Sequence, residues 1–144
     1  MKSDTIIISI HPAFVEKILS GEKKYEYRKR FPEGVRYMLV YTTSPVKMIT
    51  ALIEIESVLV GSPNDVWRKT KKNAGVTKRF FDAYFKDKAD AYAVEFKNIH
   101  VLEKPLKITE VNGACAAPQS YIYTKDCFSN IIDIMSKNEQ SEKR

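Results

Sequence analysis

The charged stretch 21-GEKKYEYRKR-30 contains residue types that could form a binding site for a polar or anionic group. Its ten residues include five cations, two carboxylates and two tyrosines. A carboxylate accepts hydrogen bonds from an amine and a guanidinium donates to oxygens, so a Lys/Glu/Arg cluster can hold a polar planar group. On spacing alone, the same stretch is also compatible with a solvated ladder of surface charges, whose ion pairs contribute only about 0–1 kcal/mol.

The elements that surround this stretch determine how its side chains are placed. Pro12 and the apolar spacing of 12-PAFVEKILS-20 predict a helix, which Gly21 ends in a left-handed cap. From Tyr25 the pattern changes to period two, so 24-KYEYRKR-30 is predicted to be a strand. One face of that strand carries Lys24, Glu26, Arg28 and Arg30, and the other carries Tyr25, Tyr27 and Lys29.

The charged face of this strand could either face bulk water or line a cleft. In a cleft, Glu26 would need cationic or hydrogen-bonding partners to stay ionised. Arg28 on the same face could supply one, and Lys23 beside the helix–strand junction could supply another.

The rest of the chain predicts further strands and helices. Strands are predicted at 5–10, 36–43, 48–60, 91–96 and from Ile99 to about Ile108, and 112–120 is predicted to be a loop. Helices are predicted after the cap-like 62-SPND-65, after Thr77, and from Lys125 to about Lys137. This order predicts an α+β fold in which short strands close into a small β-barrel with helices packed around it, and a sandwich stays open. We expect one domain over 1–137 and a frayed tail over 138–144.

Composition narrows the class of protein. No stretch approaches the ~20 apolar residues of a membrane span, and the N-terminus lacks a cleavage site for a signal peptide, so we expect a cytoplasmic protein. The cysteines Cys115 and Cys127 form no CxxC pattern, and His11 and His100 share no metal-ligand spacing. No phosphate-binding glycine loop is present. The sequence therefore predicts neither a metal site nor a cofactor.

The charge balance favours a polyanionic partner. The chain carries 24 Lys+Arg against 18 Asp+Glu, for a net charge of +6. A second cluster, 68-RKTKKNAGVTKR-79, holds six cations and no acid. One basic run on a helix is often only a solvated face, but two clusters on a small domain favour nucleic acid.

The motifs together resemble a known family. The opening 7-IISIHPAFVEKILSGEKKYEYRKR-30 is similar to that of ASCH domains, a branch of the PUA-like superfamily, whose Gly-x-Lys-x-x-Glu-x-Arg pattern falls on Gly21, Lys23, Glu26 and Arg28. The segments 39-LVYTTSPVKMITALIEI-55, 91-AYAVEF-96 and 118-PQSYIY-123 resemble later family segments. The resemblance implies a small β-barrel, a cleft lined by the Lys/Glu/Arg motif, and RNA as the partner.

One branch with this fold hydrolyses acetylcytidine with a Lys, a Thr and a Glu. The resemblance allows the positions of these three catalytic groups to be compared with this sequence. The Lys corresponds to Lys23, but the Thr corresponds to Glu26, and the region of the Glu is the basic run around Lys71 and Lys72. Two of the three groups therefore do not match.

We accordingly expect an RNA- or nucleotide-binding PUA-like module. The expected contact residues are Lys23, Lys24, Glu26, Arg28, Arg30, Ser44, Gln119, Ser120, Lys71 and Lys72, with Lys29 beside them and Tyr25, Tyr27 or Trp67 available for stacking. An alternative is a hydrolase acting on a modified nucleoside or on RNA, with Lys23 as the activating cation and Glu26 as the general base. A third is a protein-interaction module, with Ile131 and Met135 facing a protein partner.

Overall fold

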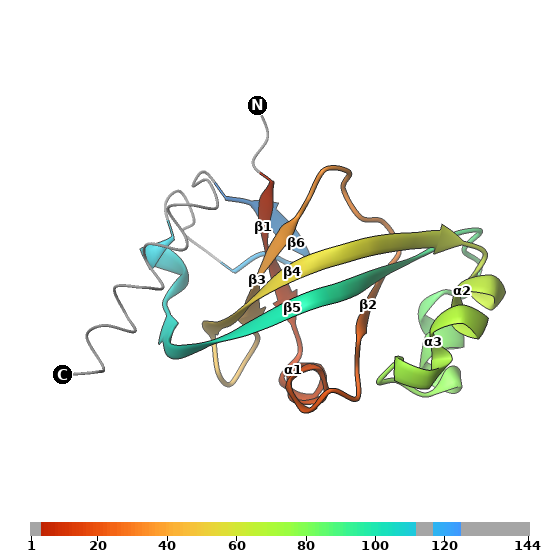
Figure 1. The fold of residues 1–144 in the computed structure, drawn as a ribbon, viewed down its shortest axis with the longest axis horizontal. Coiled ribbons are helices and arrows are strands. Elements are labelled where there is room, and N and C mark those ends of the chain that lie inside the picture. Colours follow the sequence, from red (N-terminus) through yellow and green to blue (C-terminus); the bar gives the residue numbers. More distant parts are fainter. Residues whose placement is uncertain (1–3, 112–116, 125–144) are drawn as a thin grey trace.

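A computed structural model describes residues 4–111 and 117–124 of the chain (Figure 1). The strands are β1 (Thr5–Ile10), β2 (Tyr25–Arg28), β3 (Tyr37–Thr42), β4 (Met48–Gly61), β5 (Ala91–Leu106) and β6 (Tyr121–Tyr123). The helices are α1 (Pro12–Ser20), α2 (Pro63–Thr70) and α3 (Lys78–Tyr84), with short 3-10 turns η1 (Lys71–Asn73) and η2 (Ile108–Glu110). The predicted helix from Lys125 to Lys137, which includes Ile131 and Met135, and the tail 138–144 lie outside the described residues.

The three helices begin where the sequence predicts, and α1 also ends at the predicted residue. Pro12 opens α1, and Gly21 ends it with a φ of 90°. Ser62 caps α2 and Thr77 caps α3, each through a side-chain oxygen that accepts a backbone N–H two or three residues into the helix. The α1 cap is His11, whose Nδ1 accepts the N–H of Ala13. The junction between α1 and β2 is therefore set by local signals.

One prediction about strands was wrong, and one strand was missed. The segments 91–96 and 99–108 form one strand, β5, because β4 runs beside it along its whole length. Pro105 falls where the ladder shifts register between Val101 and Leu106, so its missing N–H removes no pairing contact. Strand β6 was not predicted, since its three residues are too few to show a period.

The strands form one mixed sheet in the order β2-β5-β4-β3-β1-β6. Only β1 and β3 pair in parallel, and the other neighbours are antiparallel. The sheet curves into a half-barrel whose ends are β2 and β6, and no backbone ladder joins those two strands among the described residues. The predicted α+β, barrel-like class is confirmed, with a half-barrel as the form that the described strands take.

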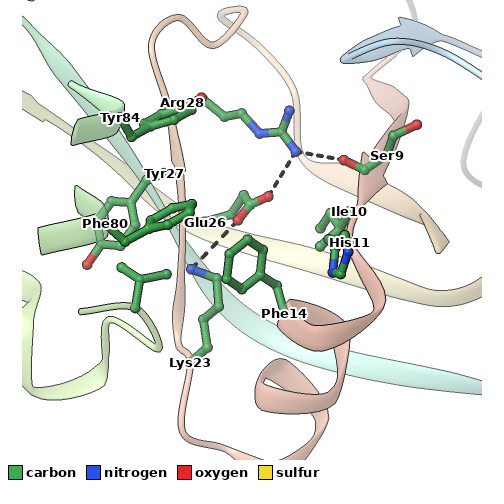
Figure 2. A pocket seen from close by; sticks show the side chains of 11 residues that line it. Ser9, Ile10, His11, Phe14, Lys23, Glu26, Tyr27, Arg28, Phe80 and Tyr84 are labelled. Atoms are coloured by element: carbon green, nitrogen blue, oxygen red, sulfur yellow. Dashed lines mark hydrogen bonds and ion pairs between the residues drawn. The ribbon is translucent and has the colours of Figure 1, made fainter. Parts of the chain in front are cut away.

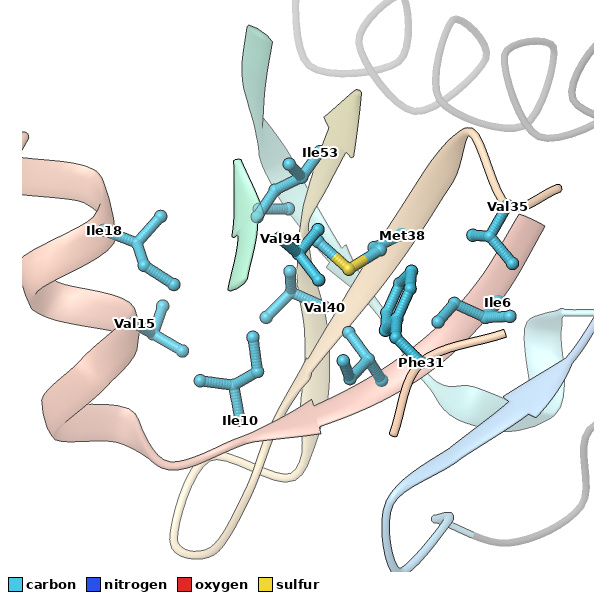
Figure 3. Close-up of a cluster of buried hydrophobic side chains, with 12 residues drawn as sticks. Ile6, Ile10, Val15, Ile18, Phe31, Val35, Met38, Val40, Ile53 and Val94 are labelled. Atoms are coloured by element: carbon cyan, nitrogen blue, oxygen red, sulfur yellow. The ribbon is translucent and has the colours of Figure 1, made fainter. Parts of the chain in front are cut away.

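Strand β1 runs through the core and is buried on both faces. Ile6, Ile8 and Ile10 pack with residues of α1 and with Met38 and Val40 in one cluster (Figure 3). Ile7 points the other way, into a second cluster with Leu39 and residues near the end of β5. A strand covered on both sides is expected to read as a continuous apolar run, as 5-TIIISI-10 does.

Helices α2 and α3 lie at the end of the β4–β5 ribbon (Figure 1). A third cluster of buried side chains joins these helices to β2 and β5. Its centre is Phe81, 1% exposed, which meets the ring of Tyr27 edge-on at 5.0 Å. The Tyr27 hydroxyl pairs with Thr70 Oγ1 at 2.7 Å. Strand β2 is thereby fixed to the α2–α3 layer.

The loop before α3 is held by three consecutive carbonyls. Asn73 O accepts the backbone N–H of Lys24 at 2.9 Å. Ala74 O accepts from Lys23 Nζ at 3.0 Å, and Gly75 O accepts from Lys17 Nζ at 3.2 Å. The loop is therefore held against the junction of α1 and β2 by donors from that junction alone.

Gly75 should be intolerant of a side chain. Its φ is +69°, and a Cβ would meet the stem of Lys23, at 2.7 Å from Cγ and 2.9 Å from Cδ. We expect Gly75→Ala to lower the free energy of unfolding by about 1–3 kcal/mol from backbone strain, plus the cost of displacing Lys23. Gly34→Ala is the matched control, because Gly34 has a φ of +79° and no atom near the Cβ position. Equal losses in urea unfolding would contradict the proposed contact.

The stability of the protein should depend on Tyr27 at high pH. Burial raises the pKa of Tyr27 from 10.0 to about 12. Between these two pH values Tyr27 is deprotonated in the unfolded chain but still protonated in the folded chain. Its contribution to the free energy of unfolding is therefore fully present below pH 10 and is lost as pH rises towards 12. The loss amounts to roughly 2–3 kcal/mol. The decline should be smaller by this amount in Tyr27→Phe, which keeps only the decline from other tyrosines with a raised pKa, such as Tyr25 and Tyr84. Parallel pH profiles for the two proteins would refute the assignment.

Candidate nucleotide-binding cleft

The charged motif opens into a cavity between β1, α1, β2 and α3 (Figure 2). Its volume is about 190 Å³. The lining residues are Ser9, Ile10, His11, Phe14, Lys23, Glu26, Tyr27, Arg28, Val76, Phe80 and Tyr84. Segments far apart in the chain therefore meet at the gap beside the edge strand β2.

Glu26 lies at the floor of the cavity between two cations. Its side chain is 8% exposed, and Oε2 accepts from Arg28 Nη2 at 2.9 Å. Lys23 Nζ lies 3.7 Å from Oε1, and Figure 2 shows the two cations approaching from opposite sides. A buried carboxylate is costly unless it is paired, and loss of one partner leaves an uncompensated charge. The arrangement therefore presents a fixed, charged acceptor to the cavity.

Lys23 is one of the most deeply buried side chains, with 1% exposure. Its ammonium contacts Ala74 O and Glu26, and it lies over the Tyr27 ring at 4.8 Å from the centroid. Burial lowers the pKa of Lys23, and the carboxylate of Glu26 opposes that shift. Lys23 thus holds its proton less firmly than a surface lysine, which suits a group that donates or exchanges a proton.

Arg28 bridges the gap in the half-barrel. In addition to Glu26, its Nη2 donates to Ser9 O at 2.9 Å, and its Nη1 donates to Ser120 Oγ at 3.2 Å. Ser9 belongs to β1, and its Oγ donates to Pro118 O at 2.6 Å. A side chain thus links β2 to β1 and to the segment before β6, where no backbone ladder does so in the described chain.

Aromatic rings form the wall and mouth of the cavity. Phe14 meets His11 edge-on at 6.2 Å and Phe80 at 5.4 Å, and Phe80 lies parallel to Tyr84 at 6.4 Å. Phe80 is 47% exposed, unlike its buried neighbour Phe81. Burial raises the pKa of the Tyr84 hydroxyl. The rings offer flat apolar faces next to the charged floor.

Sequence reasoning missed the role of Phe80. The sequence predicts the helix after Thr77 that carries Phe80 and Phe81, but Phe80 is not among the predicted site residues. Consecutive residues on a helix lie about 100° apart, so the two rings cannot both face the same core. The adjacent pair was the signal that one ring would be left at the surface. His11 was likewise interpreted as structural, and it both caps α1 and lines the cavity.

The other candidate residues lie at varying distances from the cavity. Ser120 contacts Arg28 without lining the cavity. Ser44 is exposed in the β3–β4 turn, Gln119 is exposed before β6, and neither lines the cavity. Exposed positions outside the cavity are also occupied by Lys24, Lys29, Arg30, Lys71 and Lys72.

The predicted stacking residues are used mainly in packing. Trp67 lies against Phe81 at 4.9 Å, and Tyr25 donates to Glu95 Oε2 at 3.1 Å. Tyr27 belongs to the third core cluster, although one side of it reaches the cavity. Phe80 and Tyr84 are better placed for stacking on a ligand.

Residues 4–111 and 117–124 contain no group of three or more His, Cys, Asp or Glu side chains that could hold a metal ion. No helix in the same ranges has the length and apolar character required to cross a bilayer.

Known proteins resemble this chain in sequence and in fold. It is 26% identical over 139 residues to an ASCH domain-containing ribonuclease of Zymomonas mobilis, covering 92% of this chain and 93% of that protein. It is 31% identical over 125 residues to the large ribosomal subunit protein uL22 of Ureaplasma parvum, covering 85% of this chain. It spans only 40% of the length of that ribosomal relative.

Crystal structures of ASCH from Zymomonas mobilis have the same fold. One superposes with a TM-score of 0.78 at 22% identity, over 96% of this chain and 94% of the other. A serine-to-alanine variant of ZmASCH superposes with a TM-score of 0.81 at 22% identity, over 94% and 96% of the two chains. The sequence model of the ASCH domain matches residues 8–109, which include the whole Gly21–Arg28 motif. This chain is therefore a member of the ASCH domain family.

Proposed function

We propose that this chain binds single-stranded RNA and takes one unpaired nucleotide into the cavity lined by Lys23, Glu26 and Arg28. The observation that carries the proposal is the Glu26 carboxylate, held between two cations at the floor of a cavity with aromatic walls. Such a floor matches the polar edge of a base, and such walls match its flat faces.

The hydrogen-bonding groups suit a base with an exocyclic amine. A carboxylate accepts from an amine such as N4 of cytosine, and a guanidinium donates to a carbonyl oxygen. A base can present this edge only when it is unpaired, which favours single-stranded RNA over a duplex. The net charge of +6 would support the phosphate backbone outside the cavity.

The relatives support RNA as the partner. One is named a ribonuclease and resembles this chain over nearly its full length, and another is named a ribosomal protein. The surface contacts expected of Lys24, Arg30, Lys71 and Lys72 belong to this proposal. A fully closed barrel is also part of this proposal. Contacts from Gln119 or Ser44 to bound RNA are part of it as well.

RNA cleavage is a second candidate function. The named activity of the Zymomonas mobilis relative favours it, as does the lowered pKa of Lys23 in the cavity. Lys23 would stabilise a developing negative charge, and Glu26 would accept a proton. The acetylcytidine hydrolase alternative has less support, because the segment at Lys71 and Lys72 brings no carboxylate into the cavity.

Phe80 should contribute to binding without supporting the fold. Stacking of a base on an aromatic ring contributes about 1–3 kcal/mol, so Phe80→Ala should weaken RNA binding by roughly 5- to 150-fold. Phe80→Trp should retain most of the affinity. Leu19→Ala is the control, because Leu19 is 44% exposed and does not line the cavity. Fluorescence anisotropy with labelled single-stranded RNA measures the effect. Equal affinities for Phe80→Ala and Leu19→Ala would argue against the cavity as the binding site.

Glu26→Gln separates a binder from an enzyme. In a binding site it removes a charged acceptor and should cost about 1.5–3 kcal/mol of affinity. In a cleaving site it removes a general base and should lower the rate by about 100- to 10,000-fold. Labelled RNA and acetylcytidine are each incubated with wild type, Glu26→Gln and the exposed control Glu56→Gln, and products are resolved by gel and chromatography.

For a binder we expect no products and weaker RNA binding by Glu26→Gln alone. RNA fragments that disappear in Glu26→Gln but persist in Glu56→Gln would establish the second candidate. Release of cytidine with the same pattern would establish the hydrolase alternative. Circular dichroism of each variant checks that the fold is retained.

A further inference from the structure

A second hollow adjoins the cavity and has a different character. Its volume is about 490 Å³, and it is more open to solvent. Polar residues dominate its lining, which includes Lys17, Glu22, Lys72, Asn73 and Thr77. Val76 lines both spaces, so the second hollow lies directly beyond one wall of the cavity.

Helix α1 connects the two spaces. Phe14 lines the cavity, and Lys17, three residues further on, lines the second hollow. Residues three apart on a helix share a face, with about 5–6 Å between their Cβ atoms. A ligand lying along this face would place a flat apolar group at Phe14 and an anionic group at Lys17. A nucleotide has this order of groups, since its base and phosphate are separated by a sugar.

The two ammonium groups of the hollow are available for an anion. Lys17 Nζ is positioned by its bond to Gly75 O at 3.2 Å, which uses one of its three donors. Lys72 is exposed on η1, and neither lysine forms an ion pair within the described part of the chain. In the same basic run, Arg68 and Lys78 are each paired with an aspartate at 2.8 Å. Lys72 is the cation of this run that lines the hollow.

One carboxylate opposes this charge. Glu22 also lines the hollow, so two lysines face one acid and the net charge of the lining is positive. A phosphate group bound between Lys17 and Lys72 would be attracted by both lysines and repelled by Glu22. Removal of either lysine should therefore weaken phosphate binding, and removal of the Glu22 charge should strengthen it.

We propose that this hollow is a phosphate subsite, in which Lys17 and Lys72 bind the RNA backbone phosphate next to the nucleotide held in the cavity. The proposal rests on the proposed function and deepens it. It assigns the direction in which the bound RNA leaves the cavity, over Val76 and towards η1. It also narrows the role of the 68–79 run from a general basic surface to one defined contact.

Salt dependence tests the subsite, because each phosphate contact on a single strand contributes about −0.7 to the slope of log K against log[salt]. The probe is a fluorescein-labelled single-stranded RNA of about ten nucleotides, titrated over a series of KCl concentrations. Lys72→Ala should make the slope less steep by about 0.7. Lys104→Ala, which removes the same charge from an exposed position outside both spaces, should leave the slope unchanged. Glu22→Gln should strengthen binding at low salt.

The outcomes separate this inference from the proposed function. Phe80→Ala should weaken binding at every salt concentration and leave the slope as in wild type. If wild type binds no RNA, or if Phe80→Ala has no effect, the proposed function fails and the subsite fails with it. If Phe80→Ala weakens binding but Lys72→Ala and Lys104→Ala give the same slope, the subsite alone is overturned. Weaker binding by Glu22→Gln at low salt would also overturn it.

Discussion

A buried ammonium needs hydrogen-bond acceptors from within the protein. Because Lys23 is buried, other segments of the chain must supply these acceptors. Its Nζ takes one acceptor from the loop before α3, Ala74 O, and faces the Glu26 carboxylate on β2. Its stem occupies the space beside Gly75. The loop can therefore approach only with glycine at that position, and the approach brings Val76 and the start of α3 to the cavity. The positions of Phe80 and Tyr84 thus depend on a lysine far earlier in the chain.

Arg28 bridges the gap that a half-barrel leaves between its edge strands. An open edge normally exposes unpaired backbone groups. Here one guanidinium contacts a β1 carbonyl, a serine before β6 and the carboxylate of its own strand. Structural closure and the proposed ligand recognition therefore depend on the same group. A ligand that draws Arg28 away from Ser9 or Ser120 must replace those contacts, which favours ligands with oxygens in the same places.

The sequence was most informative where local signals and the family motif agreed. Pro12, Gly21 and the change of period at Tyr25 defined the turn that brings Lys23, Glu26 and Arg28 together. It was least informative for positions that depend on distant packing. Ser44 and Gln119 lie in loops, whose direction no local pattern specifies. Phe80 follows its helix's apolar pattern, and only the packing of Phe81 against Tyr27 shows which of the two rings stays outside. The open form of the sheet depends on strand order, which one sequence does not encode in any short segment.

The charged floor and the aromatic wall of the cavity come from different parts of the chain. The floor belongs to residues 23–28, where Glu26 is paired with Lys23 and Arg28, whereas Phe80 and Tyr84 belong to α3. Substitutions on the outer face of α3 can therefore reshape the entrance while the buried ion pairs keep their balance. If the cleft binds a nucleotide as proposed, this separation would make its specificity adjustable at little cost in stability. One scaffold could in this way serve different ligands by exchanging a single short helix.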